Sequence, residues 1–173
     1  VVYLNGVAVA VIELKKSTVS VSNGIRQNLT NQREMFIEPF FTTMQFCMAG
    51  NDSEGLRYGT IRTKEKYYLE WKKDGFTEYP EERDEVDVRI EEICDTIPNR
   101  LDRDLFAMFY KVRFLNLIHN FLIFDKGQKK VCRYNQYYAI KRAQYRLTEE
   151  KRGGIIWHTQ GSGKTLTMIW LSK

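Results

Sequence analysis

A glycine-rich stretch near the carboxyl end has residue types that can hold phosphate groups. Glycines let backbone N–H groups turn towards a phosphate, a lysine neutralises its charge, and a threonine hydroxyl can hold Mg²⁺. The residues that we expect to contact nucleotide phosphates are Thr159, Gln160, Gly161, Ser162, Gly163, Lys164 and Thr165. Among them, Thr165 is the predicted Mg²⁺ ligand. The alternative interpretation is a glycine-rich connection whose lysine is merely exposed.

A carboxylate and an amine near the amino end form a second candidate site. Glu13 and Lys15 lie two residues apart at the end of the apolar run 7–12, so their side chains point to the same side of a strand. Charges at such a position are unfavourable unless they are paired or solvated. Metal-assisted phosphodiester cleavage would explain the pair, because the carboxylate would hold Mg²⁺ and the ammonium would stabilise the developing charge. An ordinary ion pair at a strand end is the alternative.

A β-sheet is expected to position the side chains of Glu13 and Lys15. Residues 1–16 predict a β-hairpin, because Asn5 and Gly6 suit a type I′ turn. The second strand of this hairpin is apolar without alternation, which predicts a place inside the sheet. Further strands are expected over residues 40–48, 56–60 and 67–71, with a loop over 49–55 and a weak helix over 24–36.

The remainder of the chain has helical spacing until the glycine-rich stretch. From Asp84 apolar residues recur at helical intervals, and we expect this segment to break at Pro98-Asn99 and to end near Gly127. The elements expected after it are a helix over 135–147, a short buried strand over 155–157 and a helix over 166–171.

Composition excludes several classes of protein. The chain has 173 residues, of which 43% are apolar, so it can form a globular core. No run of about eighteen apolar residues occurs, so no membrane partner is expected. The sequence has three cysteines, Cys47, Cys94 and Cys132, and their spacing does not match a metal-binding motif. An odd number of cysteines and the lack of a secretory signal favour a cytoplasmic location.

The net charge of +5 is unevenly distributed. Residues 1–80 carry 10 basic and 9 acidic side chains, residues 81–104 carry 4 and 10, and residues 105–173 carry 13 and 3. A polyanion would therefore be attracted to the last third and repelled by the middle.

Residues 157–165 resemble motif I of the superfamily 2 helicase-type motors, in the form used by restriction subunits. His158 stands where the general phosphate-loop pattern has glycine, which disfavours kinases and small GTPases. The same motors have an adenine-reading glutamine upstream, and residues 133–140 resemble that Q motif with Gln136 as the match. A glutamine amide can both donate to and accept from one adenine edge. The resemblance implies ATP and Mg²⁺ as cofactors.

The hairpin and the strand that ends in Glu13-Leu14-Lys15 resemble the PD-(D/E)xK nuclease core of Type I restriction-modification R subunits. The similarity continues through residues 24–32, 48–52, 55–60 and 68–72 to the Q motif and motif I. It implies that Glu13 is a catalytic metal ligand and that Lys15 and Gln27 are catalytic. Asn31 stands where the family's glutamine motif has its tyrosine, and the family's first acidic metal ligand would fall just before Val1.

This resemblance implies an α/β fold in three parts. A restriction-endonuclease-like mixed sheet, truncated at its amino end, would cover residues 1–80, a helical connector 81–130, and the opening strand, phosphate loop and helix of a RecA-like motor lobe 131–173. The parent protein would translocate double-stranded DNA with ATP and cut unmodified DNA with Mg²⁺. Its partners would be methyltransferase and specificity subunits, which carry S-adenosylmethionine. These 173 residues alone are expected to be inactive.

Two other functions are compatible with the same residues. The chain could belong to a superfamily 2 DNA helicase whose amino-terminal sheet is a noncatalytic module that binds DNA or a partner. It could also be a noncatalytic interaction piece, with the acidic segment on a basic partner and the basic segment on the DNA backbone.

Overall fold

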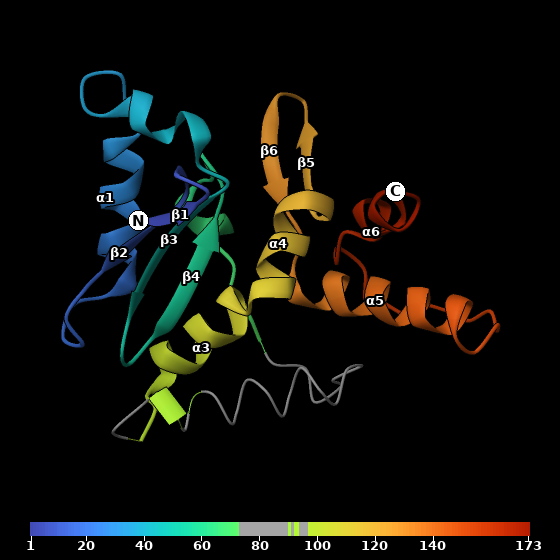
Figure 1. Cartoon of the computed structure of the whole chain (residues 1–173). Coiled ribbons are helices and arrows are strands. Elements are labelled where there is room, and N and C mark those ends of the chain that lie inside the picture. Colours follow the sequence, from blue (N-terminus) through green and yellow to red (C-terminus); the bar gives the residue numbers. More distant parts are fainter. Residues whose placement is uncertain (73–89, 91, 94–96) are drawn as a thin grey trace.

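A computed structural model describes residues 1–72, 90, 92–93 and 97–173 and shows a mixed α/β architecture (Figure 1). The amino half contains β1 (Val2–Leu4), β2 (Val7–Leu14), α1 (Val21–Asn31), the 3-10 helix η1 (Glu38–Thr43), β3 (Phe46–Asn51), β4 (Gly55–Gly59) and the 3-10 helix η2 (Glu65–Tyr67). The carboxyl half contains α3 (Arg100–Phe109), α4 (Lys111–Asn120), β5 (Leu122–Asp125), β6 (Gln128–Val131), α5 (Tyr134–Thr148) and α6 (Lys164–Leu171). Among the described residues, no helix has both the length and the apolar character needed to cross a bilayer.

The larger sheet is mixed and has the strand order β1-β2-β3-β4. β2 and β3 are parallel, and α1 makes the crossover between them, whereas the other neighbours are antiparallel. Asn5 and Gly6 have φ angles of 49° and 80°, as a type I′ turn requires. The predicted hairpin and the interior position of its second strand are therefore confirmed.

The two faces of β3 pack against different layers, because side chains alternate along a strand. Phe46 and Met48 belong to the main core, whereas Ala49 packs with Val21 and Ile25 of α1. Figure 1 shows α1 on one side of this sheet. The sheet is therefore buried on both faces at β3.

Local structure in the amino half differs from the predicted ranges at several points. The α1 helix begins at Val21, because the Ser20 side chain caps it, and it ends at Asn31 rather than continuing to residue 36. The strand predicted over 40–48 starts only at Phe46 and runs through Asn51, into the predicted loop. A 3-10 helix precedes it because Pro39 lies in the first turn and favours helical φ. Residues 67–71 form an isolated bridge between Tyr58 and Leu69 instead of a strand.

A hairpin replaces the end of the predicted helical segment. The break at Pro98-Asn99 is confirmed, since Asn99 caps α3 in a capping box with Asp102. The prediction of a helix to Gly127 is wrong, because β5 and β6 pair around a turn in which Lys126 and Gly127 have φ angles of 51° and 77°. Most of the helical pattern predicted between residues 84 and 96 lies outside the described residues.

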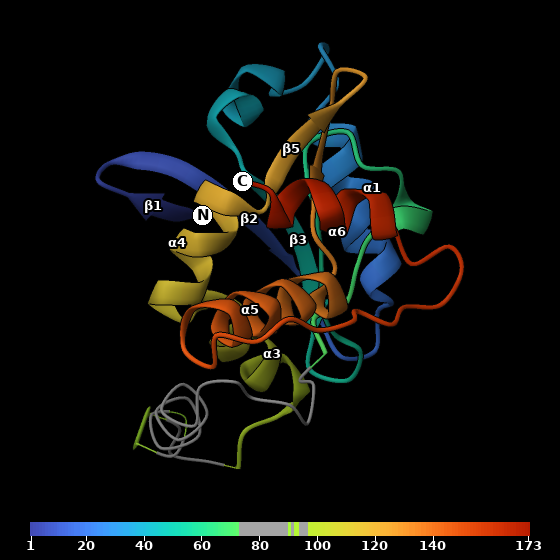
Figure 2. The same cartoon turned by 90° about the vertical axis from the view of Figure 1, so that its right-hand side faces the viewer.

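The final elements surround the glycine-rich stretch. The predicted helix over 135–147 is confirmed as α5, and the predicted helix after the loop is confirmed as α6, which begins at Lys164. The buried strand predicted over 155–157 is wrong: Ile155 and Trp157 are 91% and 89% exposed, and these residues form no strand. No described strand pairs with them, so no ladder can form there. Figure 2 shows α5 and α6 side by side.

One apolar core extends from the sheet to the last helix. It includes Phe46 of β3, Met108 of α3, Leu117 of α4, Ile140 of α5 and Trp170 of α6. The core therefore packs the amino-terminal sheet together with α3, α4, α5 and α6.

Candidate functional site

The end of β2 brings together the three residues predicted for the nuclease site. Lys15 Nζ donates to Glu13 Oε1 at 2.9 Å and to Gln27 Oε1, on α1, at 2.5 Å. The Lys15 backbone N–H donates to the Gly50 carbonyl at 3.0 Å, which continues the pairing of β2 with β3. The side chains of Lys15 and Glu13 are only 20% and 24% exposed. One ammonium group therefore links the strand to the helix at a half-buried position.

The helix that supplies Gln27 lies unusually close to the strand. A Cβ atom at Gly24 would lie 3.0 Å from Ala49 Cβ and 3.3 Å from the Glu13 carbonyl oxygen. Further along α1, the buried Asn28 side chain donates from Nδ2 to the Met48 carbonyl at 2.7 Å. These two contacts fix how α1 presents Gln27. Sequence reasoning did not assign a role to Gly24 or Asn28, although both fall in the stretch that carries the resemblance.

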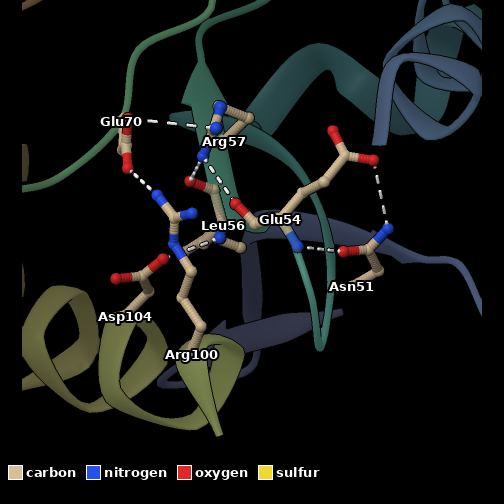
Figure 3. Close-up of polar contacts among 7 residues, drawn as sticks. All are labelled: Asn51, Glu54, Leu56, Arg57, Glu70, Arg100 and Asp104. Carbon is tan, nitrogen blue, oxygen red and sulfur yellow. Dashed lines mark hydrogen bonds and ion pairs between the residues drawn. The ribbon is translucent and has the colours of Figure 1, made fainter. Parts of the chain in front are cut away.

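The turn between β3 and β4 anchors the start of the same helix. Asn51 Oδ1 accepts from the Glu54 backbone N–H at 2.6 Å, and Asn51 Nδ2 donates to the Val19 carbonyl at 2.8 Å. Glu54 Oε1 in turn accepts from the Val21 backbone N–H at 3.0 Å. Asn51 and Glu54 are seen together in Figure 3. They act as structural residues that position α1.

A second polar cluster joins β4 to α3 (Figure 3). Leu56 N–H donates to Asp104 Oδ2 at 2.9 Å, and Glu70 contacts Arg57 at 3.9 Å and also Arg100. Burial raises the pKa of the Asp104 carboxyl. Sequence reasoning missed this cluster because its members are far apart along the chain and match no motif.

The capacity of the amino-terminal site for a metal rests on Glu13. No group of three or more His, Cys, Asp or Glu side chains able to hold a metal occurs among the residues that the structure describes. Mg²⁺ keeps several waters and is often held by one or two carboxylates together with substrate phosphates. Glu13 is compatible with one such ligand, next to an ammonium group that can neutralise a phosphate.

Both glycines of the glycine-rich loop adopt positive φ, which this residue type favours. Gly161 and Gly163 have φ angles of 78° and 83°, and α6 begins immediately afterwards at Lys164. Lys164 Nζ donates to the His158 and Thr159 carbonyls at 3.0 and 3.1 Å, so the ammonium closes the loop on itself. Of the predicted phosphate-contacting residues, those exposed to solvent are Thr159, Gln160, Gly161, Lys164 and Thr165.

Gln136 lies directly against this loop. The side chain is 2% exposed, and Nε2 donates to the Ser162 and Gly163 carbonyls at 3.2 and 3.1 Å. Its Oε1 accepts from the Arg133 backbone N–H at 2.8 Å. Both ends of the amide are thus engaged within the chain, and Gln136 braces the loop. Its role in reading adenine stays a prediction, since it requires an exchange of these bonds.

Comparison with known proteins supports both halves of the sequence interpretation. Residues 1–66 match the family "Type I restriction enzyme R protein N terminus", and residues 135–173 match the family "SWI2/SNF2 ATPase". The chain is 27% identical over all its length to a putative type I restriction enzyme MjaIXP endonuclease subunit of Methanocaldococcus jannaschii. It is 26% identical over 97% of its length to the type I restriction enzyme HindI endonuclease subunit of Haemophilus influenzae.

These matches cover a small part of each relative. The chain spans 18% of the Methanocaldococcus subunit and 16% of the Haemophilus subunit. With an R-protein amino-terminal region followed by the start of a SWI2/SNF2-type ATPase, the chain belongs to the family of type I restriction enzyme R subunits. The predicted family is therefore confirmed.

Proposed function

We propose that the chain supplies a Mg²⁺-dependent phosphodiester-cleaving site and an ATP-binding loop to a type I restriction subunit. The whole subunit would translocate double-stranded DNA with ATP and cut unmodified DNA in the cytoplasm. It would do so with methyltransferase and specificity subunits, which alone would carry S-adenosylmethionine. The observation that carries the proposal is the contact of the Lys15 ammonium with both Glu13 and Gln27.

Each residue of this site has a separate role in the proposal. Glu13 holds Mg²⁺, which when bound polarises the phosphate and lowers the pKa of a water. Lys15 stabilises the negative charge that develops on the phosphate oxygens. Gln27 orients the Lys15 ammonium through its side-chain carbonyl, at 2.5 Å. Because Lys15 and Glu13 are half-buried, their charges are less screened than those of a surface pair.

The loop residues 159–165 would bind the phosphates of ATP. The N–H groups at the start of α6 and the Lys164 ammonium are the donors for the phosphates, and the Thr165 hydroxyl is a Mg²⁺ ligand. Lys164 currently donates to His158 and Thr159 carbonyls, so binding requires it to exchange those acceptors for phosphate oxygens.

Substituting Lys15 tests the nuclease half in the whole subunit assembled with its partners. Lys15→Ala should lower the rate of DNA cleavage at least about 100-fold, because it removes one transition-state donor, while ATP hydrolysis is retained. Lys16→Ala, at the exposed neighbouring position, is the matched control and should cleave normally. Normal cleavage by Lys15→Ala would contradict the proposal and favour a DNA helicase with a noncatalytic amino-terminal module.

A further inference from the structure

A cavity of about 470 Å³ lies beside the carboxyl end of α1. Its lining comes from the end of α1 and the segment that follows, from the start of η1 and from the loop after β4: Leu29, Gln32, Arg33, Glu34, Glu38 and Arg62. Figure 1 shows the segment that links α1 to η1 at the upper edge of the molecule, on the opposite side from α6. The lining includes no residue of the glycine-rich loop and none of Glu13, Lys15 and Gln27. The cavity is therefore separate from both candidate sites.

Gln32 presents a buried hydrogen-bond donor at this cavity. The residue is 5% exposed, and its Oε1 atom accepts from the Arg62 backbone N–H at 2.6 Å. This bond fixes which end of the amide faces Arg62, because only the oxygen can accept. The Nε2 atom is buried and has no hydrogen-bond partner among the described residues. Buried polar groups almost always have such a partner, so a ligand that brings an acceptor oxygen is indicated.

The Arg62 wall of the cavity is already held in place. Arg62 has a φ angle of 59°, a left-handed conformation that residues other than glycine seldom adopt. The bond to Gln32 Oε1 and the ion pair between Arg62 Nη2 and Glu38 Oε1, at 2.6 Å, fix it there. A preformed wall lowers the ordering cost of binding.

The charges around the cavity are balanced. Arg62 and Glu38 pair with each other, whereas Arg33 and Glu34 are exposed and form no ion pair with any residue that the structure describes. Two arginines and two glutamates give the lining no net charge, so a polyanion such as DNA is not favoured here. A polypeptide fits better, because it can present charges of both signs.

Three consecutive apolar side chains extend this surface beyond the cavity. Met35, Phe36 and Ile37 are 79%, 52% and 51% exposed, and they directly follow Glu34. Methionine, aromatic residues and arginine are enriched at protein–protein interfaces relative to other surfaces. Exposed apolar groups with a polar rim mark such interfaces. The surface therefore suits another protein better than a small molecule.

We propose that residues 32–38, together with Arg62, form a docking surface for a second polypeptide of the restriction complex. That polypeptide places a main-chain carbonyl oxygen on Gln32 Nε2 and apolar side chains over Met35 and Phe36. It also brings a carboxylate and a cation to the two unpaired charges of the docking surface. This inference rests on the proposed function, in which the chain works with methyltransferase and specificity subunits. It adds which part of the amino-terminal region contacts them.

Binding of the whole subunit to its assembled partner subunits, measured by biolayer interferometry, tests this inference. Phe36→Ser should weaken binding at least about tenfold, because an apolar contact of the docking surface is lost. Arg33→Glu should also weaken binding, because the introduced carboxylate faces a charge of the same sign. Phe124→Ser, at a phenylalanine that is 73% exposed on β5, is the matched control and should bind like the wild type.

The outcomes distinguish this inference from the proposed function. A wild-type subunit that does not bind the methyltransferase and specificity subunits would overturn the proposed partners together with the inference. Wild-type binding that Phe36→Ser leaves unchanged would overturn the inference alone. If Phe36→Ser also lowers the stability of the whole subunit in that case, the segment packs against another part of the same subunit.

Two other occupants of the docking surface have their own signatures. If Phe36→Ser weakens binding to a DNA duplex and leaves the affinity for the partner subunits unchanged, the surface contacts DNA and the inference is wrong. Sedimentation velocity of the 173-residue chain tests for a second copy. A wild-type dimer that Phe36→Ser converts to a monomer would assign the surface to self-association and would also overturn the inference.

Discussion

Gln136→Ala removes three hydrogen bonds from a buried position and tests whether this side chain holds the glycine-rich loop. The lost bonds join Nε2 to the Ser162 and Gly163 carbonyls and Oε1 to the Arg133 N–H. A hydrogen bond contributes about 1 kcal/mol net, and water can reach the half-exposed Gly163, so we expect a loss of about 2 kcal/mol in the free energy of unfolding. Urea titration followed by circular dichroism measures this loss, with Gln144→Ala, at an exposed position on α5, as the matched control.

Gln136→Glu separates the two ends of the amide. A carboxylate still accepts from the Arg133 N–H, but its second oxygen faces two carbonyl oxygens and cannot donate to them. The loop should therefore be released at neutral pH and held again as the pH falls, because a protonated carboxyl can donate to one carbonyl. Limited proteolysis within residues 151–161 reports the release. An unfolding free energy of Gln136→Ala within about 0.5 kcal/mol of the wild type would refute the bracing role.

Two further predictions follow from buried ionisable groups. Burial raises the pKa of the Cys47 thiol to about 12 and that of Cys132 well above its usual range, so iodoacetamide at pH 8 should leave both unmodified until the chain is unfolded, as judged by mass spectrometry. Rapid labelling of either thiol in the folded chain would contradict their burial. The raised pKa of Asp104 means that the folded state holds this proton more tightly than the unfolded chain, so the contribution of Asp104 to stability falls as the pH rises through its folded pKa. Asp104→Asn, whose carbonyl can still accept from Leu56 N–H, should therefore gain stability relative to wild type at pH 7 and lose that advantage near pH 3, whereas a constant difference across this range would oppose the assignment.

The elements that the sequence predicted well are those with strong local signals. Asn5 and Gly6 specify their turn because both residue types readily adopt positive φ. Pro98 interrupts the helical pattern of the sequence, and Asn99 caps α3, which begins at the next residue. Glu13, in β2, and Lys15, directly after β2, lie on the same side because side chains of an extended chain alternate with a period of two residues. These features depend on residues that are neighbours in the sequence, so their prediction does not require knowledge of the tertiary contacts around them.

The features that were missed depend on contacts between distant residues. The spacing of Leu115, Ile118 and Leu122 suits a helix, but Lys126 and Gly127 adopt positive φ and β5 pairs with β6. This Lys-Gly pair was the available signal for a two-residue turn. The run 155–157 is apolar enough for a strand, yet a strand also needs a hydrogen-bonded neighbour, which the sequence of that run does not specify.

The same distinction applies to the candidate sites. The resemblance of residues 133–140 and 157–165 to two motor motifs placed Gln136 and the loop in one nucleotide site, but it did not reveal that Gln136 bonds the loop itself. That contact joins residues 26 and 27 positions apart and depends on how α5 packs against α6.

β4 and the residue after it contact the β5–β6 hairpin and the residue that follows it through two side-chain hydrogen bonds. Tyr58 Oη donates to the Cys132 carbonyl at 3.1 Å, and Thr60 Oγ1 donates to the Lys129 carbonyl at 2.6 Å. β4 pairs with β3, whose Gly50 carbonyl receives the Lys15 backbone N–H, while Cys132 directly precedes the start of the segment that carries Gln136. Tyr58 and Cys132 are also buried in the same apolar core, so β4 and the residue that directly follows β6 pack together. The described parts of the amino-terminal sheet, the hairpin and helices α3 to α6 share one packed core, and the domain boundaries near residues 80 and 130 stay a prediction.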